Sequence, residues 1–213
     1  MESAPRSSCT PSRCDHTVAL TQRAGLRLGD GIVRRIVEGK MRAITFWKVI
    51  TVDRANLLER LTALLAEYGI RYCVIGGQAV NAYVEPLVSL DLDLVAAVDQ
   101  LDQVESLLRR SFQVKSFPHS LNVSLADSDL RVQIQTDPRY APFPARAMPQ
   151  SVLGLVLPVA RLEDVLQGKV WAAQDPTRRA SKRQKDLADI ARLLEAYPTL
   201  HEQVPPEILT RLI

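Results

Sequence analysis

Two short segments decide the fold of this chain: IGGQA at residues 75–79 and DLDLV at residues 91–95. In the first, a glycine pair follows an apolar run and opens a short helix, predicted over residues 77–83. In the second, Asp91 and Asp93 have the spacing of a strand, in which residues i and i+2 point to the same face. Both carboxylates are therefore aimed at one spot, while the leucines that alternate with them face a core.

These residue types suit a metal ion and phosphate groups. Carboxylate oxygens are hard ligands for Mg²⁺, which keeps water and substrate phosphates as its remaining ligands. Glycines allow a phosphate to approach the backbone, and the free N–H groups of a helix start attract anions. Ser89 has the strand parity of Asp91, so its hydroxyl is placed to hydrogen-bond a phosphate oxygen. We therefore expect a magnesium–nucleoside triphosphate site built from Gly76, Gly77, Ser89, Asp91 and Asp93.

Each part of this site also has a simpler interpretation. Gly76 and Gly77 are compatible with an ordinary turn, and the two aspartates with solvent-facing positions on an edge strand. Acidic residues are disfavoured within strands, however, and two of them among leucines are costly unless they bind a ligand or are exposed. The occurrence of both motifs at this spacing favours the binding interpretation.

The glycine pair, the serine and the Asp-x-Asp pair together resemble the nucleotidyltransferase superfamily of the DNA polymerase β type. Within it, the chain is most similar to the AbiEii-type abortive-infection toxins and related minimal nucleotidyltransferases, from about Leu57 to Tyr197. The similarity includes LEDVLQGK at residues 162–169 and KDLADI at residues 185–190. It implies an α/β fold, with a mixed sheet flanked by helices and a C-terminal helical cap, and it implies Mg²⁺ as cofactor.

The resemblance also assigns a role to Lys169, because a lysine on this helix commonly serves the site in that family. From the residues alone, the favoured interpretation of Lys169 is a surface lysine whose stem snorkels. Asp186 and Asp189 lie at i, i+3 in the last helix, predicted over residues 182–196. We expect them to be favourable near the positive end of that helix and not to be catalytic.

Two positions depart from the family pattern. Active members usually supply a third carboxylate from a neighbouring strand, but the strand predicted here over residues 130–136 has Gln133 at that position. A glutamine oxygen can bind Mg²⁺ but cannot act as a general base. Asp129 and Asp137 share its parity, yet at the rise of a strand each lies about 13 Å away. Many relatives also carry an arginine where this chain has Leu87.

The sequence leaves three functional hypotheses. The first is a Mg²⁺-dependent nucleotidyltransferase that moves a nucleotidyl group from an NTP to a hydroxyl of RNA or protein, as a toxin with a cognate antitoxin. The second is a degenerate member of the fold that binds nucleotide or a partner without catalysis, as Gln133 and Leu87 would suggest. The third takes Asp-x-Asp as the motif of a sugar-nucleotide glycosyltransferase, against which the short chain and the glycine placement argue.

Basic residues gather between the last two predicted helices, and such a patch could bind phosphate-rich RNA such as tRNA. The alternative is a solvated loop. Net charge is only +3, so the chain as a whole shows no commitment to nucleic acid. The candidate RNA-binding residues are Arg178, Arg179, Lys182, Arg183 and Lys185.

Composition indicates one folded domain with an appendage. Residues 1–40 are rich in Ser, Pro, Arg and Gly and are expected to be a disordered tail or a gene-model extension upstream of a start at Met41. Residues 41–213 would form the domain, with a core over 53–160 and a helical part over 161–213. The apolar fraction of 46% supports a real core. Three cysteines argue against a disulfide scaffold.

No apolar run is long enough to span a membrane, and no secretory signal is recognisable, so we expect a cytoplasmic protein. Periodicity predicts further elements around the site. Helices are expected over residues 53–68, 101–110 and 162–173, and strands over 71–75, 90–98, 112–117, 121–125 and 153–159. Residues 140–149 are predicted to be a surface loop, and Cys73 a buried strand residue.

Overall fold

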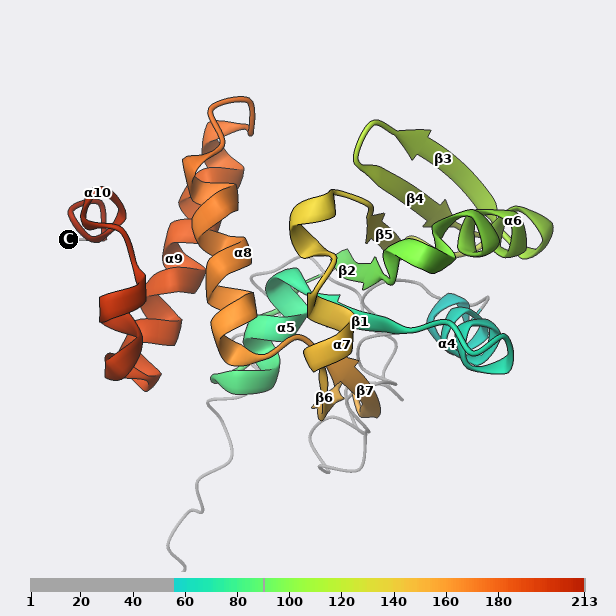
Figure 1. Ribbon diagram of the computed structural model, residues 1–213, viewed down its shortest axis with the longest axis horizontal. Coiled ribbons are helices and arrows are strands. Elements are labelled where there is room, and N and C mark those ends of the chain that lie inside the picture. Colours follow the sequence, from blue (N-terminus) through green and yellow to red (C-terminus); the bar gives the residue numbers. More distant parts are fainter. Residues whose placement is uncertain (1–55, 90, 213) are drawn as a thin grey trace, which may run out of the picture. The chain divides into compact units, whose positions relative to one another are not determined.

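A computed structural model describes residues 56–89 and 91–212 of the chain, so the expectations for residues 1–40 and for a start at Met41 lie outside the described residues. Within the described part, seven strands form one mixed sheet in the order β3-β4-β5-β2-β1-β7-β6 (Figure 1). The strands are β1 (Tyr72–Ile75), β2 (Asp91–Ala96), β3 (Gln113–Phe117), β4 (Ser120–Ser124), β5 (Arg131–Gln135), β6 (Met148–Val152) and β7 (Leu155–Val159). The predicted mixed α/β sheet is confirmed.

Strand β2 occupies the middle of this sheet. It pairs antiparallel with β1 on one side and parallel with β5 on the other. Strand β1 in turn runs parallel to β7, which pairs antiparallel with β6. Because β2 has a partner on both sides, the interpretation of its aspartates as residues of an edge strand is wrong.

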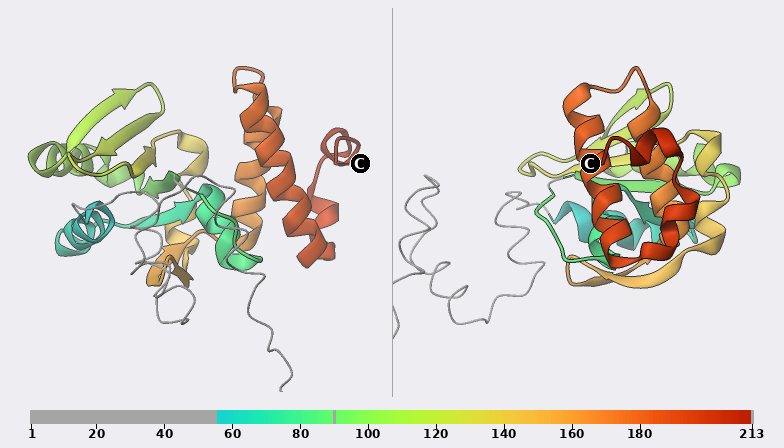
Figure 2. Two further views of the ribbon diagram at one scale, coloured as in Figure 1. Left: turned by 180° about the vertical axis from the view of Figure 1, so that it is seen from behind. Right: turned by 90° about the vertical axis from the view of Figure 1, so that its left-hand side faces the viewer.

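The helices flank the sheet and extend beyond it. Helices α8 and α9 pack side by side at one end of the sheet, whereas α4 and α6 lie at the other, as the views in Figures 1 and 2 agree. Helix α5 packs against both β2 and α8. The helices are α4 (Leu57–Glu67), α5 (Gly76–Tyr83), α6 (Leu101–Ser111), α7 (Phe143–Arg146), α8 (Leu162–Gln174), α9 (Ala180–Ala196) and α10 (Pro206–Leu209).

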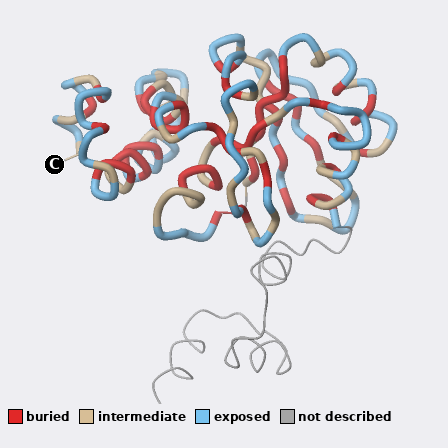
Figure 3. The backbone as a smooth tube through the Cα atoms, turned by 60° about the horizontal axis from the view of Figure 1, so that its bottom comes forward, coloured by how far each residue is buried: buried red, intermediate tan, exposed pale blue. Residues whose placement is uncertain are grey.

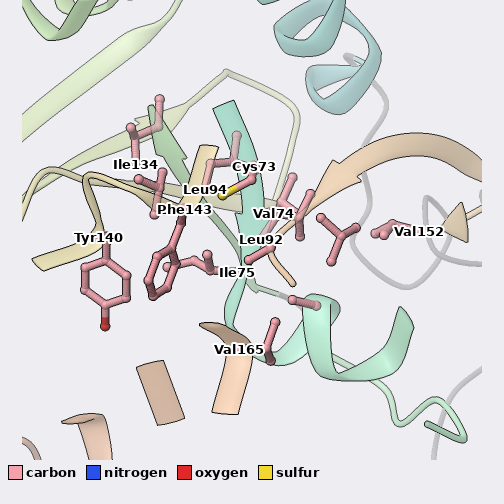
Figure 4. Packing of buried hydrophobic residues seen from close by; sticks show 14 of the residues in the cluster. Cys73, Val74, Ile75, Leu92, Leu94, Ile134, Tyr140, Phe143, Val152 and Val165 are labelled. Atoms are coloured by element: carbon pink, nitrogen blue, oxygen red, sulfur yellow. The ribbon is translucent and has the colours of Figure 1, made fainter. Parts of the chain in front are cut away.

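The core follows the apolar periods of the sequence. On α4 the leucine stripe is buried, and on β2 Leu92 and Leu94 are 0% and 1% exposed. Buried stretches run along the strands and the inner faces of the helices (Figure 3). Cys73 packs in β1 among Val74, Leu94 and other apolar side chains, as predicted (Figure 4). This packing makes β2 a rigid support for the polar residues that alternate with its leucines.

The region between β5 and α8 differs from the prediction. Residues 140–149 were expected to be a loop, but they contain α7 and the start of β6. The strand expected over residues 153–159 is present as β7, but it forms a hairpin with the unpredicted β6. Leu153 and Gly154 form its turn, with φ of 54° and 84°. Positive φ at both turn residues is the conformation that two-residue hairpins favour. The proline and polar residues of β6 concealed this strand.

No described helix has the length and apolar character that crossing a bilayer requires.

Candidate functional site

The two aspartates of β2 lie on one face of the strand, next to the start of α5. Asp93 is level with Ile75 of β1 on one side and with Gln133 of β5 on the other. Gly76 follows Ile75 with a φ of 68°, and a Cβ atom added there would collide with the Asp93 carboxylate. Glycine is therefore required at position 76 for its backbone conformation and for the close approach of Asp93.

The second glycine faces a different set of groups. A Cβ atom at Gly77 would lie 3.3 Å from Ser89 Oγ and 3.8 Å from Lys185 Nζ. The segment that carries Ser89 is fixed to α5, because the buried Gln78 donates a hydrogen bond from Nε2 to the Ser89 carbonyl oxygen at 2.9 Å. Three groups therefore converge at Gly77: the N-terminal backbone of α5, the Ser89 hydroxyl group and the Lys185 ammonium group.

Burial raises the pKa of Asp93 above its ordinary value, and the charge of Asp91 acts in the same direction. The charge of Lys169 lowers the Asp93 pKa and is second only to burial, and Arg178 and Lys182 act in the same direction as Lys169. The cause is physical: a carboxylate that loses water without a hydrogen-bonded partner is less favourable in its charged form. The protein therefore holds at Asp93 a negative charge that its own groups compensate incompletely.

Asp91 is more open, and one cation reaches it. Lys182, near the start of α9, places Nζ 3.3 Å from Asp91 Oδ2, with the two side chains 46% and 37% exposed. Such an exposed pair is weak. The contact nevertheless shows that the basic segment before and within α9 lies at the mouth of the aspartate site.

Lys169 is buried and not a surface lysine, so the snorkelling interpretation is wrong. Its Nζ atom lies 3.0 Å from Asp186 Oδ1 and 2.7 Å from Asp189 Oδ2. Burial alone would lower the pKa of Lys169, but Asp189 and Asp186 offset this effect and hold the pKa above its ordinary value. Lys169 also lines the pocket that contains Asp91 and Asp93.

The expectation that Asp186 and Asp189 are stabilised by the positive end of the last helix is likewise wrong. Helix α9 begins at Ala180, earlier than predicted, so both aspartates lie beyond its first turn, where the influence of the helix end has faded. They are 2% and 4% exposed and serve as the partners of Lys169. Sequence spacing could not reveal this pairing, because it depends on how α8 packs on α9.

The five basic candidates for RNA binding divide into two groups. Arg178 donates from Nε to Asp186 Oδ2 at 2.7 Å, and Arg183 donates to three backbone carbonyls of the preceding loop, including that of Arg178 at 2.8 Å. These two arginines stabilise the loop and the helix pair. Lys182 and Lys185 line the pocket, and Arg179 is exposed.

Gln133 is exposed and stands beside Asp93 in register, at the position where a third carboxylate was expected. In the described part of the chain, no group of three or more His, Cys, Asp or Glu residues is arranged to hold a metal ion. The oxygen donors here are two carboxylates and the Gln133 amide. Leu87, the other position at which the chain departs from the family pattern, is 59% exposed.

One pocket, with a cavity volume of about 220 Å³, brings these groups together. It joins all of the predicted site residues: Gly76, Gly77, Ser89, Asp91, Asp93, Gln133 and Lys169. Among the lining residues that sequence reasoning missed are Tyr140, Phe143 and Asp164. For Tyr140 and Phe143, the available signal was the presence of two aromatic residues in a segment rich in proline and alanine. Asp164 forms an ion pair with Arg146 of α7.

Comparison with known families matches residues 97–211, more than half of the chain, to the family described as "Nucleotidyl transferase AbiEii toxin, Type IV TA system". The matched segment contains Gln133, Lys169 and Asp186, whereas the glycine pair and the β2 aspartates precede it. Comparison with curated proteins gives no match.

Several solved structures are similar to this chain at low sequence identity. The crystal structure of ANT(2")-Ia in complex with adenylyl-2"-tobramycin has a TM-score of 0.53 at 14% identity, over 74% of this chain and 97% of that one. The solution structure of ANT(2'')-Ia has a TM-score of 0.48 at 14% identity, over 69% and 90%. Lincomycin-bound LnuA, a lincosamide antibiotic adenylyltransferase, has a TM-score of 0.46 at 12% identity, over 67% and 99%.

Proposed function

The chain belongs to the AbiEii nucleotidyl transferase family, and on this premise we propose that it is a Mg²⁺-dependent enzyme that moves a nucleotidyl group from an NTP to a hydroxyl group. One observation carries the proposal. Two carboxylates on one face of β2, the glycine start of α5 and two lysines of α9 line the same pocket. Carboxylates would hold the metal ion, and the glycines and lysines would hold the phosphates.

The donor set fits magnesium. Asp91, Asp93 and the Gln133 amide offer hard oxygens, and Mg²⁺ usually takes one or two carboxylates together with substrate phosphates. Because Gly76 has no side chain, the Asp93 carboxylate can lie directly against the backbone at the start of α5. When bound, the ion would neutralise phosphate charge and help to orient the transferring group.

The residues of the chain then have separate tasks. The N–H groups at Gly77, the Ser89 hydroxyl and Lys185 bind phosphate oxygens. The acceptor oxygen attacks the α-phosphorus, a new P–O bond forms, and the bond to the bridging oxygen breaks, so that pyrophosphate leaves. The acceptor hydroxyl also loses its proton. Because Gln133 cannot accept it, one of the β2 carboxylates must do so or the proton passes to water.

Lys169 contributes through position and charge. An ammonium group has three N–H donors, of which Asp186 and Asp189 engage two, so one remains for a ligand in the pocket. The buried pairs also join α8 to α9. We assign to Lys169 the role of fixing this wall of the site and contacting substrate with its remaining donor.

The acceptor is the less defined half of the reaction. The family description names a toxin of a toxin–antitoxin system, which supports a macromolecular target and a cognate antitoxin. RNA is our first choice and a protein hydroxyl the alternative. Because Arg178 and Arg183 have internal partners, contact with RNA such as tRNA would rest mainly on Arg179, Lys182 and Lys185. A cytoplasmic location belongs to the same proposal.

Incubation of the full chain with labelled NTPs, total RNA and a protein extract tests this function. Transfer of label to RNA or protein that needs Mg²⁺, and that is lost in Asp93→Asn, is the expected result. A second candidate function, favoured by Gln133 beside Asp93, is nucleotide binding without turnover. Binding of Mg-NTP with no labelled product from any of the common NTPs would favour that candidate. Absence of binding would contradict both.

A further inference from the structure

Tyr140 is a buried tyrosine at the end of a short 3-10 segment, Pro138–Tyr140, that follows β5. The residue is 7% exposed. Its ring meets Phe143 edge-on at a centroid distance of 5.2 Å and Trp171 at 5.3 Å. Gly168 leaves room for it, because a Cβ atom there would lie 3.3 Å from Tyr140 Cε1. The ring is therefore held in one place by α7 and α8.

The Tyr140 hydroxyl lines the pocket, and among the residues that the structure describes it has no hydrogen-bond partner. Two other tyrosines of the fold, Tyr83 and Tyr197, differ in this respect. Tyr83 donates to the Ala160 carbonyl oxygen at 2.8 Å, and Tyr197 donates to the Tyr83 carbonyl oxygen at 2.9 Å. The Tyr140 hydroxyl is not among the buried polar atoms that lack a partner, so it is open to the pocket although the rest of the residue is buried. A ligand in the pocket would supply the hydrogen-bond partner that the fold does not give to the Tyr140 hydroxyl.

The surroundings of Tyr140 indicate which part of a nucleotide it meets. Burial raises the pKa of Tyr140 to about 12, so its hydroxyl is neutral and donates a hydrogen bond at physiological pH. The groups suited to phosphate lie elsewhere, at Gly77, where Ser89 and Lys185 converge. In Figure 4 the Tyr140 oxygen is turned away from the apolar cluster, and the residue is well separated from α5. Its place is on the aromatic wall of the pocket.

We propose that the Tyr140 hydroxyl hydrogen-bonds the nucleoside part of the NTP and not its triphosphate. This inference rests on the proposed function. Phosphate oxygens are drawn to the helix start and the lysines, which leaves the uncharged nucleoside to face the neutral hydroxyl and the ring edges of Tyr140 and Phe143. Tyr140 would thus position the nucleoside and set how tightly it is held.

Calorimetric titration of the full chain with Mg²⁺ and α,β-methylene analogues of the four common NTPs tests this inference, with Mg²⁺ and inorganic triphosphate as the probe without a nucleoside. Tyr140→Phe keeps the ring and removes only the hydroxyl. For the best-bound analogue we expect about a 10-fold loss of affinity, the size of one hydrogen bond. Affinity for triphosphate and the melting temperature without ligand should both be retained.

Tyr83→Phe is the matched control, because it removes a hydroxyl that has a partner within the fold. It should lower the melting temperature and leave nucleotide affinity unchanged. Unchanged nucleotide affinity in Tyr140→Phe, or equal losses for nucleotide and triphosphate, would overturn the inference alone. So would a fall in its melting temperature as large as that of Tyr83→Phe. A wild-type chain that binds no Mg-NTP would overturn the proposed function, and this inference with it.

Discussion

Two pairs of aspartates line or adjoin the same pocket, and they differ in how far cationic side chains neutralise them. Asp186 and Asp189 of α9 are buried, and they meet Lys169, Arg178 and Arg192 at distances between 2.7 and 3.0 Å. Among the described residues, only Lys182 forms an ion pair with the β2 aspartates, in an exposed contact 3.3 Å from Asp91.

The difference separates structure from function. The helix pair is neutralised by side chains of the fold itself, as a buried charge must be if it is to contribute to stability. The β2 aspartates are only partly neutralised by the fold, and this uncompensated charge destabilises the unliganded protein. Such charge at a pocket is typical of a site that binds a cation. We therefore assign the α9 pair to the assembly of the helical wall and the β2 pair to the ligand. Each variant below changes the surroundings of at most one of the two pairs.

The largest expected effect comes from completing the strand pair. Gln133→Asp would add a third carboxylate beside Asp93 and a candidate base. If the missing base limits turnover, the transfer rate should rise by about 10²–10⁴-fold, the typical value of general-base assistance. The variant should be less stable without Mg²⁺, because like charges then stand side by side, and should recover with it.

Asn122→Asp is the control for this change, because Asn122 of β4 pairs with Gln133 but is exposed and does not line the pocket. It should give no gain in rate. Brisk transfer by the wild-type chain that falls in Gln133→Asp would show that the base lies elsewhere, and would reject the idea that the site lacks one.

Removing the cation from the helix pair should chiefly affect stability. In Lys169→Met, Asp186 and Asp189 lose the partner they share, and breaking a buried pair in this way costs about 3–5 kcal/mol. The free energy of unfolding, measured in urea, should fall by that amount. Lys182→Met removes the exposed cation of the strand pair and serves as the comparison. Equal losses in the two variants would contradict the assignment of the helix pair to the fold.

Neutralising Asp93 should stabilise the unliganded chain. A group whose folded pKa is raised contributes its stability below the unfolded pKa, about 3.9, and loses it as pH rises through the folded value. At pH 7 the charged Asp93 is therefore a burden, which Asp93→Asn removes. We expect a melting temperature higher by about 2–4 °C at pH 7, the shift that 1 kcal/mol gives in a domain of this size.

The same variant should show little difference from the wild type near pH 3, where Asp93 is protonated and equally neutral. Thermal unfolding at the two pH values, without added metal, measures this. A lower melting temperature of Asp93→Asn at pH 7 would mean that the fold itself depends on this carboxylate.

The smallest effect is expected in the basic loop. Lys182→Ala breaks an exposed pair and should change the free energy of unfolding by less than about 1 kcal/mol. Arg183→Ala should cost more, because Arg183 donates to the carbonyls of Asp175, Pro176 and Arg178. Urea unfolding compares the two. If Lys182→Ala is the more damaging change, Lys182 belongs to the fold and not to the ligand site.

The sequence was sufficient for the parts of the site that depend on local geometry. Strand parity placed Asp91 and Asp93 on one face, because the side-chain period of a strand is fixed. The position of Gln133 beside them was expected only from the family resemblance, and the register of β5 on β2 agrees with it. Burial of the leucines in β2 and α4 followed from periodicity in the same way. The predicted glycine start of α5 also agrees with the structure.

What the sequence could not supply depends on tertiary contacts. The pairing of Lys169 with Asp186 and Asp189 arises only when α8 packs on α9, and no spacing rule encodes it. Tyr140 reaches the pocket because α7 and Gly168 hold its ring. The β6 strand was missed because Pro149, Gln150 and Ser151 break the apolar alternation by which strands are recognised.

The most direct test of the account compares one aspartate from each pair in the same titration. Asp93→Asn and Asp189→Asn change the same atoms, and Asp189 lies outside the residues that line the pocket. By calorimetry, Asp93→Asn should weaken Mg-NTP binding by at least about 10- to 100-fold, the range seen even for outer partners of metal sites. Asp189→Asn should bind as the wild type does while unfolding more readily. Unchanged affinity in Asp93→Asn, or an equal loss in Asp189→Asn, would contradict the account.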